Sequence, residues 1–450
     1  MGKPLRIKRG LNLNLTGGAP RPACVAEMAK AVAATVALVP DDFTGLTPKM
    51  DVREGDRVEC GSALWHDKEF CDIKVVSPVT GCVKREVRGE RRKVLAVEIA
   101  ADKDCPTVSK ACDAPKTAES LKKSLMEQGV WAQMRQLPFD IVPMVSAVPR
   151  DVFVTAWDAA PLAPDMSLAT EGKTAMLEKG VAALKTLTKG NVYVGRPADG
   201  RIADIAGAVM VDVEGGFPAS LPSVLAANIN PVNKGETVWL LDVVTLVRIG
   251  EVASGSDVDW SCPVAVTGSE VKTPHYVMAP AGASMRSILG DGLKGERHER
   301  VISGNVLTGV NAGADGYLRY PYTQVTVIPE GDDVDEFMGW ASLSPGKMSE
   351  SRSYPGHFLK KRLFRPDARL NGGRRAMILS GQYARYIPMD IMPEYLVKAI
   401  LARDIDKMEA LGVYEVTPAD FAAAEYADAS KLELQRIVRE GLDYLRQETV

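Results

Sequence analysis

The stretches EGDRVECGSALW (residues 54–65) and SPVTGCVKREV (residues 77–87) decide the fold of the first hundred residues. Each consists of short apolar runs separated by glycine, proline and charged residues, a texture that is typical of short β-strands joined by turns. The second stretch repeats the pattern of the first about a centre. The sequence therefore predicts a β-domain of two matching halves over residues 1–104.

This arrangement resembles the barrel-sandwich hybrid of biotinyl and lipoyl carrier domains, in which the modified lysine lies on a tight hairpin between the halves. Lys68 is the residue that such a hairpin would present. Residues 68–81 make a slightly long connection, however, and carry charges at Asp72 and Lys74. We expect a domain kept for docking, without a covalent cofactor. A carrier or adaptor protein modified at Lys68 remains an alternative.

The bulk composition is that of a globular chain. Its 450 residues suffice for about three domains, and 46% hydrophobic residues supply ordinary buried cores. A net charge of -3 at pH 7 argues against nucleic-acid binding, which normally needs a strongly basic domain. One locally basic stretch is a candidate docking surface for anionic headgroups or an acidic partner. Its cations are Lys347, Arg352, Lys360, Lys361, Arg362, Arg365, Arg369, Arg374 and Arg375.

The sequence predicts neither a signal peptide nor a membrane span. Residues 11–15 (LNLNL) alternate apolar and polar side chains, which indicates a strand and not the apolar core of a signal peptide. Nowhere does the chain offer about 18 consecutive apolar residues. We expect a cytoplasmic protein, or one that is peripheral to a membrane.

The cysteines and histidines form no metal-site pattern. The cysteines, without a Cys-x-x-Cys pair, are Cys24, Cys60, Cys71, Cys82, Cys105, Cys112 and Cys262. No cysteine follows Cys262, and a thiolate-ligated iron-sulfur cluster needs about four ligands. The part of the chain after Cys262 therefore cannot hold such a cluster. The histidines, which have no paired zinc spacing, are His66, His275, His298 and His357. We expect free thiols and no metal site.

Strands alternate with helices after a proline-punctuated linker at residues 105–115. The predicted strands are 151–156, 191–194 and 208–213. Thr117 can cap a helix that ends at Gly129, and a second helix is predicted over residues 170–190. Strand-helix-strand repeats of this length imply a parallel, Rossmann-like sheet over residues 116–258.

No phosphate-binding loop follows these strands. A dinucleotide pyrophosphate needs a G-x-G-x-x-G turn at a helix N-terminus, and the sequence has neither that turn nor a Walker-type loop. The fold by itself favours nucleotide binding, but a fold does not establish a function.

Two further units complete the predicted architecture. Residues 262–332 indicate a small α+β unit of β-grasp (SLBB-like) type, and residues 333–450 a helical domain. The strands predicted in the first of these units are 263–268, 301–305 and 324–328, and its helix is 284–289. The last helix of the chain carries an apolar stripe that we expect to be core, formed by Leu434, Val438, Leu442 and Leu445.

Four blocks of sequence resemble one family in the same order along the chain. They are GVWAQMRQLPF (129–139), FVTAWDAAPLAPD (153–165), GYLRYPYTQVTVI (316–328) and NGGRRAMILSGQYARYIPMDIMP (371–393). Through these blocks the chain resembles the peripheral A subunit of the bacterial Na+-translocating NADH:quinone reductase, over nearly its whole length.

The resemblance implies a peripheral subunit on the cytoplasmic face of the inner membrane, in a complex that passes electrons from NADH to quinone and exports Na+. The implied partners are subunits B to F, which would carry NAD, FAD, FMN, riboflavin, iron-sulfur centres and ubiquinone. This chain is expected to hold no redox cofactor. Related flavoprotein subunits bind flavin with a glycine-rich loop, whereas residues 131–139 here are bulky and would fill the space of a phosphate.

A quinone ring is flat and its carbonyls accept hydrogen bonds, so a quinone site needs an aromatic wall and one or two donors. Trp131, Arg135 and Phe139 match that description. They fit equally well an interior in which both aromatic side chains are core and Arg135 is a structural ion pair. No residue is predicted to be catalytic in the isolated chain. An independent flavin- or NADH-binding oxidoreductase is the alternative function.

Overall fold

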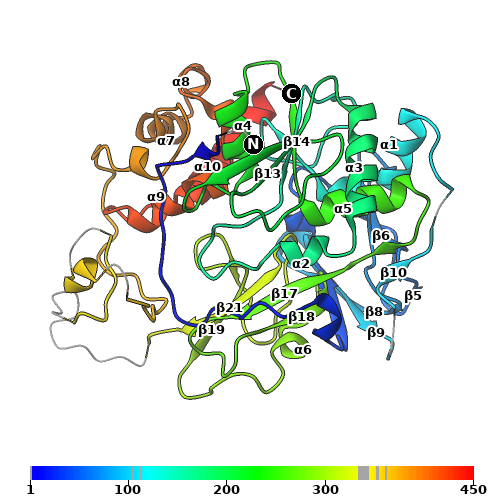
Figure 1. The fold of residues 1–450 in the computed structure, drawn as a ribbon, viewed down its shortest axis with the longest axis horizontal. Helices are drawn as coiled ribbons and strands as arrows, with labels where there is room; N and C mark the ends of the chain where they lie inside the picture. The colour runs from blue at the N-terminus through cyan, green and yellow to red at the C-terminus, as the bar shows by residue number, and fades with distance from the viewer. Residues whose placement is uncertain are drawn as a thin grey trace.

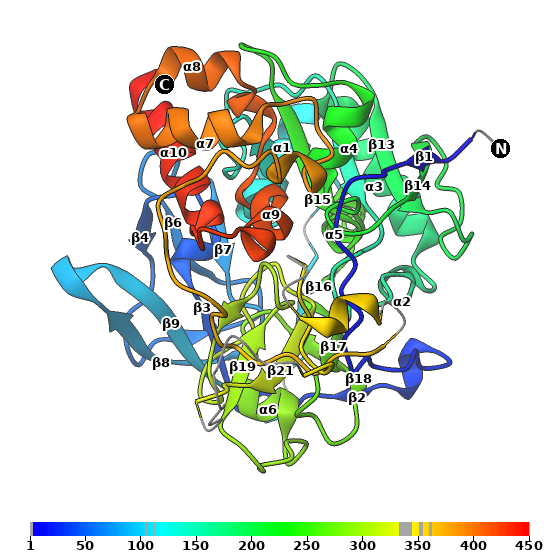
Figure 2. The same cartoon turned by 90° about the vertical axis from the view of Figure 1, so that its left-hand side faces the viewer.

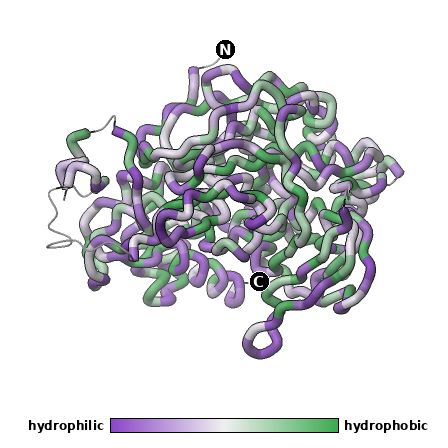
Figure 3. Tube along the Cα trace, turned by 90° about the horizontal axis from the view of Figure 1, so that it is seen from below, coloured by the Kyte–Doolittle hydropathy of each residue, from purple (hydrophilic) through white to green (hydrophobic). Residues whose placement is uncertain are grey.

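The computed structural model describes residues 3–103, 106–111, 113–332, 344–350, 354–359 and 362–449. Three small β-sheets, two six-stranded sheets and a group of helices pack against one another in the described part of the chain (Figure 1). Hydrophobic and hydrophilic stretches alternate along the coloured parts of the trace (Figure 3). Among the described residues, no helix has both the length and the apolar character that crossing a bilayer requires.

The first unit consists of two antiparallel sheets that face each other, as the two-halved sequence pattern predicted. One sheet has the order β3 (Thr35–Leu38), β9 (Val94–Ala101), β8 (Gly81–Arg88), β5 (Arg57–Val58). The other has the order β4 (Pro48–Met50), β6 (Ala63–Asp67), β7 (Lys74–Val76). Lys68 lies exposed in the turn between β6 and β7.

The predicted linker contains a strand. β10 (Val108–Ser109) pairs antiparallel with β16 (Val258–Asp259), and the indole of Trp260 donates a 3.2 Å hydrogen bond to Ser109 Oγ. The segment is therefore tied to the far end of the α/β unit. Cys105 and Cys112 lie outside the described residues.

The second unit is built on a six-stranded sheet. Its order is β1 (Leu5–Arg6), β14 (Val209–Glu214), β13 (Val192–Pro197), β12 (Val152–Thr155), β15 (Val238–Asp242), β11 (Arg135–Leu137). All neighbours are parallel except β11, which runs antiparallel to β15. The prediction of parallel strands joined by helices is confirmed, and β15 is a strand that the sequence analysis missed.

Alternate residues of the central strands feed two separate cores, because successive side chains of a strand point to opposite faces. Val152 and Val154 belong to one core, and Phe153 between them to the other. The first core is covered by α1 (Ala118–Glu127), α3 (Thr174–Leu187) and α5 (Val243–Ala253). The second is covered by α4 (Pro222–Ile229) and by the C-terminal helices, which lie together in Figure 2.

Two local predictions in this region are corrected. The helix expected over residues 170–190 is split into α2 (Ser167–Thr170) and α3, because Gly172 adopts a φ of +73° that interrupts the helical backbone. The strand expected at residues 11–15 forms only two isolated bridges, from Leu11 to Phe217 and from Leu15 to Phe364. The capped helix after Thr117 is confirmed, with a capping box between Thr117 and Ser120.

The third unit is a mixed sheet that also includes a strand from near the N-terminus. Its order is β2 (Ala29–Lys30), β18 (His275–Pro280), β17 (Ser261–Thr267), β21 (Gln324–Pro329), β19 (Glu299–Ser303), β20 (Val310–Asn311). The predicted short helix is α6 (Met285–Leu289), capped by Ser284. The chain thus starts by contributing β1 and β2 to two different sheets before it enters the first unit.

The C-terminal region, predicted to be helical over residues 333–450, has α-helices only from Pro393 onward among its described residues, which before that contain short 3-10 segments. Its helices are α7 (Pro393–Ala402), α8 (Ile405–Ala410), α9 (Ala422–Ala427) and α10 (Leu434–Thr449). Its short 3-10 segments are η6 (Pro355–Phe358), η7 (Tyr383–Arg385), η8 (Val413–Glu415) and η9 (Pro418–Phe421). The apolar stripe of α10 is fully buried against the second core, which confirms its structural role.

Candidate functional site

A cavity of about 470 Å³ opens at the carboxyl ends of β12 and β15. Thr155 ends β12 and Asp242 ends β15, and both line the cavity. After β12 the chain builds β13 and β14 on one side of that strand, and β15 then returns to the other side. In open α/β sheets, ligands bind at such a reversal of strand order. The cavity is therefore the best-placed site in the described part of this chain.

The cavity has an aromatic wall that joins three units. Tyr320 and Tyr322 come from the third unit and Trp157 from the loop after β12. The ring of Tyr320 stacks on Phe43 of the first unit, with ring centroids 5.3 Å apart and planes 3° apart. Its hydroxyl donates a 2.5 Å hydrogen bond to the carbonyl of Gln133. These contacts hold the ring of Tyr320 in a fixed position at the wall.

Arg135 is the one cation among the described residues that line the cavity. Its Nη2 donates to the carbonyl oxygen of Asp42, and its guanidinium lies 5.9 Å from the ring centroid of Tyr320. The carboxylate of Asp42 is already engaged by Arg319, at 2.6 to 2.9 Å. Arg135 Nη1 is buried and has no hydrogen-bond partner among the described residues. Such a donor is costly unless a ligand or a water satisfies it.

The N-terminus of α5 beside the cavity is occupied by a carboxylate of the chain itself, and a second carboxyl lies close to Ser220, which precedes α4. Asp242 caps α5, where its Oδ1 accepts a 2.7 Å hydrogen bond from the Thr245 amide. Asp158 Oδ1 accepts a 2.8 Å hydrogen bond from the Ala160 amide. Ser220, which precedes α4, has its Oγ 3.4 Å from the same Asp158 oxygen. Burial raises the pKa of the Asp158 carboxyl. A helix N-terminus that holds a carboxylate is not open to a phosphate.

A further carboxyl lies buried behind the cavity. Asp420 accepts hydrogen bonds from Ser223 Oγ at 2.7 Å, from the Thr417 amide at 2.6 Å and from Thr417 Oγ at 2.9 Å. Burial raises the pKa of Asp420 to about 7 in spite of these donors. Since Ser223 and Thr417 line the cavity, this group connects α4 to the C-terminal helices at the cavity edge.

Glycine plays no phosphate-binding part here. Gly304, the one glycine among the described lining residues, adopts a φ of +98°, and a Cβ there would lie 2.6 Å from the ring of Tyr322. The glycine therefore makes room for the aromatic wall.

Three lining carboxylates (Asp140, Asp158 and Asp242) face the single cation of this lining. This charge balance disfavours a phosphorylated ligand and suits a neutral one.

The structure brings one of the three candidate quinone residues to the cavity. Arg135 lines it, whereas Trp131 and Phe139 lie in the packed interior. Trp131 is fully buried, packs edge-on against Trp239 and donates a 2.9 Å hydrogen bond to the Pro143 carbonyl. Phe139 has a φ of +82° and is 5% exposed.

The aromatic residues of the wall were not singled out from the sequence. A usable signal existed, because the WD pair of Trp157 and Asp158 directly follows a predicted parallel strand. Polar and aromatic residues in that position lie at the ligand-binding edge of an open sheet. Tyr320 and Tyr322, by contrast, reach the cavity only through the packing of the third unit, which the sequence pattern does not reveal.

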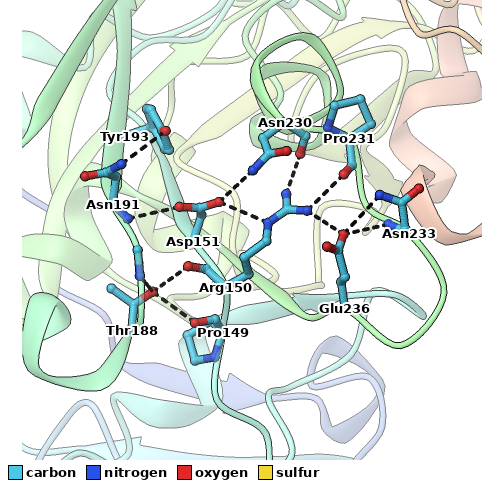
Figure 4. Close-up of polar contacts among 11 residues, drawn as sticks. Pro149, Arg150, Asp151, Thr188, Asn191, Tyr193, Asn230, Pro231, Asn233 and Glu236 are labelled. Atoms are coloured by element: carbon cyan, nitrogen blue, oxygen red, sulfur yellow. Dashed lines mark hydrogen bonds and ion pairs between the residues drawn. The ribbon is translucent and has the colours of Figure 1, made fainter.

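The opposite edge of the same sheet holds a polar network (Figure 4). Asp151, next to β12, accepts hydrogen bonds from Arg150 Nε at 3.0 Å, the Asn191 amide at 2.9 Å and Asn230 Nδ2 at 3.1 Å. Arg150 also donates to the Asn230 carbonyl at 2.6 Å and pairs with Glu236. The network binds the amino ends of three parallel strands and the end of α4 together.

Metal-ligating residues do not gather anywhere in the described part of the chain, where no three His, Cys, Asp or Glu residues could hold an ion together. The cysteines described as free thiols include Cys24, Cys71, Cys82 and Cys262. Burial raises the pKa of the Cys262 thiol to about 11, which makes it a poor nucleophile. His66 pairs with Asp51 and His298 with Asp332, and the His357 side chain lies outside the described residues.

Several cations of the basic stretch serve internal contacts. Arg365 pairs with the buried Glu270 at 2.7 Å, and Arg374 pairs with Glu433 at 2.7 Å. Arg362 and Arg375 are exposed. Arg352, Lys360 and Lys361 lie outside the described residues. The stretch therefore offers fewer free cations for docking than its composition indicates.

Models of one protein family match most of the chain. The NqrA N-terminal barrel-sandwich hybrid domain matches residues 5–102, the NqrA second alpha/beta domain residues 116–256, and the NQRA C-terminal domain residues 263–314.

Curated relatives match over their full length. The A subunit of the Na(+)-translocating NADH-quinone reductase of Pasteurella multocida is 33% identical, over 99% of this chain and 100% of the relative. Proteins of the same name from Serratia proteamaculans (33%) and Neisseria meningitidis serogroup B (31%) cover the same shares. Among solved structures, a chain of an NAD+-reducing nickel-iron hydrogenase aligns at 13% identity with a TM-score of 0.36, covering 75% of this chain and 63% of that one.

Proposed function

The chain belongs to the NqrA family, the A subunits of the Na+-translocating NADH-quinone reductase, and forms part of that oxidoreductase complex, and we propose that it serves there without a redox cofactor of its own. In this proposal the partner subunits, B to F, carry NAD, FAD, FMN, riboflavin and iron-sulfur centres. The chain is held on the cytoplasmic face of the membrane through them. The family gives no support to an independent oxidoreductase or to a carrier protein modified at Lys68.

One observation supports the proposal that this chain binds neither a flavin nor a dinucleotide. At the strand-order reversal, where a nucleotide phosphate would meet a helix N-terminus, α5 is capped by Asp242 and the approach to α4 holds Asp158. A phosphate at either place would meet a carboxylate in a partly buried setting, where repulsion between like charges is weakly screened. The site thus keeps the location of a nucleotide site but not its chemistry.

The strand order of the second unit agrees with a fold that has the location of a nucleotide site. Strands β14, β13, β12 and β15 are neighbours in that order and pair in parallel, as in a mononucleotide-binding half of a Rossmann-like sheet. We therefore assign the second unit to the Rossmann-like class. We assign residues 262–332 to the β-grasp (SLBB-like) class, since a short helix packs on a mixed sheet there.

The ligand that suits the cavity is the head group of a quinone. A quinone is flat, neutral and rich in acceptors, and the cavity offers a stacked tyrosine wall, a volume in the usual range of ligand sites, and the unsatisfied Nη1 of Arg135. In this assignment Arg135 donates to a quinone carbonyl and Tyr320 packs against the ring. Trp131 and Phe139 support the site from the interior without touching the ligand.

The proposal is tested by tagging the chain in its native host, extracting membranes in mild detergent and purifying it. We expect co-purification of the partner subunits with Na+-stimulated NADH:quinone reduction. After the chain is separated from its partners, heat-released flavin and acid-released iron should each fall below about a tenth of a mole per mole, a working threshold for no dedicated site. Stoichiometric flavin on the separated chain would contradict the proposal, whereas an assembly without this chain would contradict the subunit role.

A further inference from the structure

The long hairpin of β8 and β9 projects from the first unit and ends in a turn of charged residues (Figure 2). At its tip, the Lys93 amide donates a 3.1 Å hydrogen bond to the Glu90 carbonyl, and the Gly89 amide donates a 2.8 Å bond to the Lys93 carbonyl. The two central residues of this turn, Arg91 and Arg92, have φ values of 52° and 61°. The tip is therefore a β-turn with both central residues in the left-handed region.

That backbone is unfavourable for arginine. Turns with positive φ at both central positions strongly prefer Asn-Gly, because a Cβ comes too close to the following carbonyl oxygen in the left-handed region. Arg91 and Arg92 thus hold a conformation that another dipeptide would hold with less strain. Strained residues of this kind indicate that their side chains have a function other than stabilising the fold.

Two cations at the tip have no acidic partner among the described residues, whereas the other basic residues of the arm are paired. Residues 84–93 (KREVRGERRK) contain six basic and two acidic residues. Within the arm, Arg85 pairs with Glu98 and Arg88 with Glu86, and Lys93 pairs with Asp41. Arg91 and Arg92 are exposed, and no described residue pairs with either side chain.

We propose that this tip binds the anionic headgroups of a membrane surface. The inference rests on the proposed place of the chain at the membrane, and it assigns the contact to Arg91 and Arg92. A stable protein partner needs about 1,000 Å² of matched surface, which a four-residue turn does not supply. Lipid phosphates are separate point ligands and need no matched shape. Leu95, 42% exposed beside Gly89, adds an apolar group at the same tip.

The test measures sedimentation of the full chain with vesicles of phosphatidylcholine containing about a third phosphatidylglycerol, at low ionic strength. The decisive variant is Arg91→Asn/Arg92→Gly, because it installs the dipeptide that this turn prefers while it removes both charges. Each cation near an anionic surface contributes about 1 kcal/mol, so we expect vesicle affinity to fall about 30-fold. The thermal midpoint of the variant should equal or exceed that of the wild type.

Two controls separate the tip from the general charge of the domain. Arg91→Lys/Arg92→Lys keeps both charges and should bind the vesicles as the wild type does. Lys49→Gln/Lys68→Gln removes two exposed cations of the same unit and should also leave binding unchanged. Wild-type binding to pure phosphatidylcholine vesicles should be negligible.

Three results would overturn the inference: no binding of the wild type to anionic vesicles, equal binding by the Asn-Gly variant, or equal binding to neutral vesicles. If instead the Asn-Gly variant binds vesicles normally and loses the partner subunits on purification, the tip is a protein contact. A variant that loses vesicle binding but still assembles an active complex supports the inference. Failure of the wild-type chain to assemble would refute the subunit role instead.

Discussion

The two edges of the six-stranded sheet differ in how their polar groups are satisfied. At the amino edge, Asp151 and Arg150 make hydrogen bonds to one another and to neighbouring segments (Figure 4). At the carboxyl edge, Arg135 Nη1 is buried with no partner among the described residues, and the carboxyls of Asp158 and Asp420 have raised pKa values. The first edge stabilises the fold, whereas the second stores unsatisfied groups that a ligand can use.

The largest effect should come from the amino edge. Asp151→Ala removes three hydrogen bonds from a side chain in a buried position, and Arg150 keeps its pair with Glu236. We expect the free energy of unfolding to fall by about 3 kcal/mol, since three hydrogen bonds of about 1 kcal/mol each are lost at a buried site. Denaturant unfolding of the purified chain measures this loss.

The matched control is Asp199→Ala, which removes an aspartate that pairs with Arg201 on the surface. Exposed pairs contribute little, so this variant should stay within about 0.5 kcal/mol of the wild type. At a temperature where Asp151→Ala is still folded, its quinone affinity should equal that of the wild type. A loss of affinity as large as the loss of stability would mean that the two edges are not separate.

A smaller effect, which depends on pH, belongs to the carboxyl edge. The pKa of Asp420 is about 7 in the folded chain against an ordinary 3.8, so the folded chain keeps a proton that the unfolded chain releases. Stability therefore decreases as pH rises from about 4 through 7. Between pH 6 and pH 8 this one group lowers the free energy of unfolding by about 1 kcal/mol.

Asp420→Asn removes the titrating proton, keeps an acceptor for Thr417 and places an amide donor beside the Ser223 hydroxyl. We expect this variant to lose about 1 kcal/mol of the decrease in stability between pH 6 and pH 8. Glu415, whose pKa burial also raises to about 7, supplies a slope of the same sign that remains. Equal slopes in the variant and the wild type would show that Asp420 is ionised throughout this range.

Features that depend on neighbours along the chain were predictable. The cap at Thr117, the parallel strands and the buried stripe of α10 follow from local spacing, and all three are confirmed. The split of the predicted helix was missed because Gly172 does not signal from the sequence alone that its backbone takes a positive φ. β15 and α5 were missed because apolar residues lie on both sides of Asp242, although an aspartate in that position is a usable signal for the start of a helix.

The candidate site was only partly predictable, for a different reason. Arg135 lies in a block that the sequence analysis had singled out, and the structure brings it to the cavity. Its aromatic neighbour Tyr320 is 185 residues away in sequence, and Asp42, whose carbonyl accepts from Arg135, belongs to the first unit. The packing of three units creates this junction, and no periodicity or spacing within one unit reports it.

The carboxyl-edge account is tested most directly by measuring the affinity of a short-chain ubiquinone for the purified chain by titration calorimetry, with the wild type and Arg135→Met. A hydrogen bond from a charged donor contributes about 1.5 to 3 kcal/mol, so the account predicts at least a tenfold loss of affinity in the variant. The thermal midpoint should fall only modestly, since the variant loses the hydrogen bond from Nη2 to the Asp42 carbonyl, whereas Nη1 makes none to the described residues. Equal affinities for the two chains, or no measurable affinity of the wild type, would contradict a quinone site at the carboxyl edge.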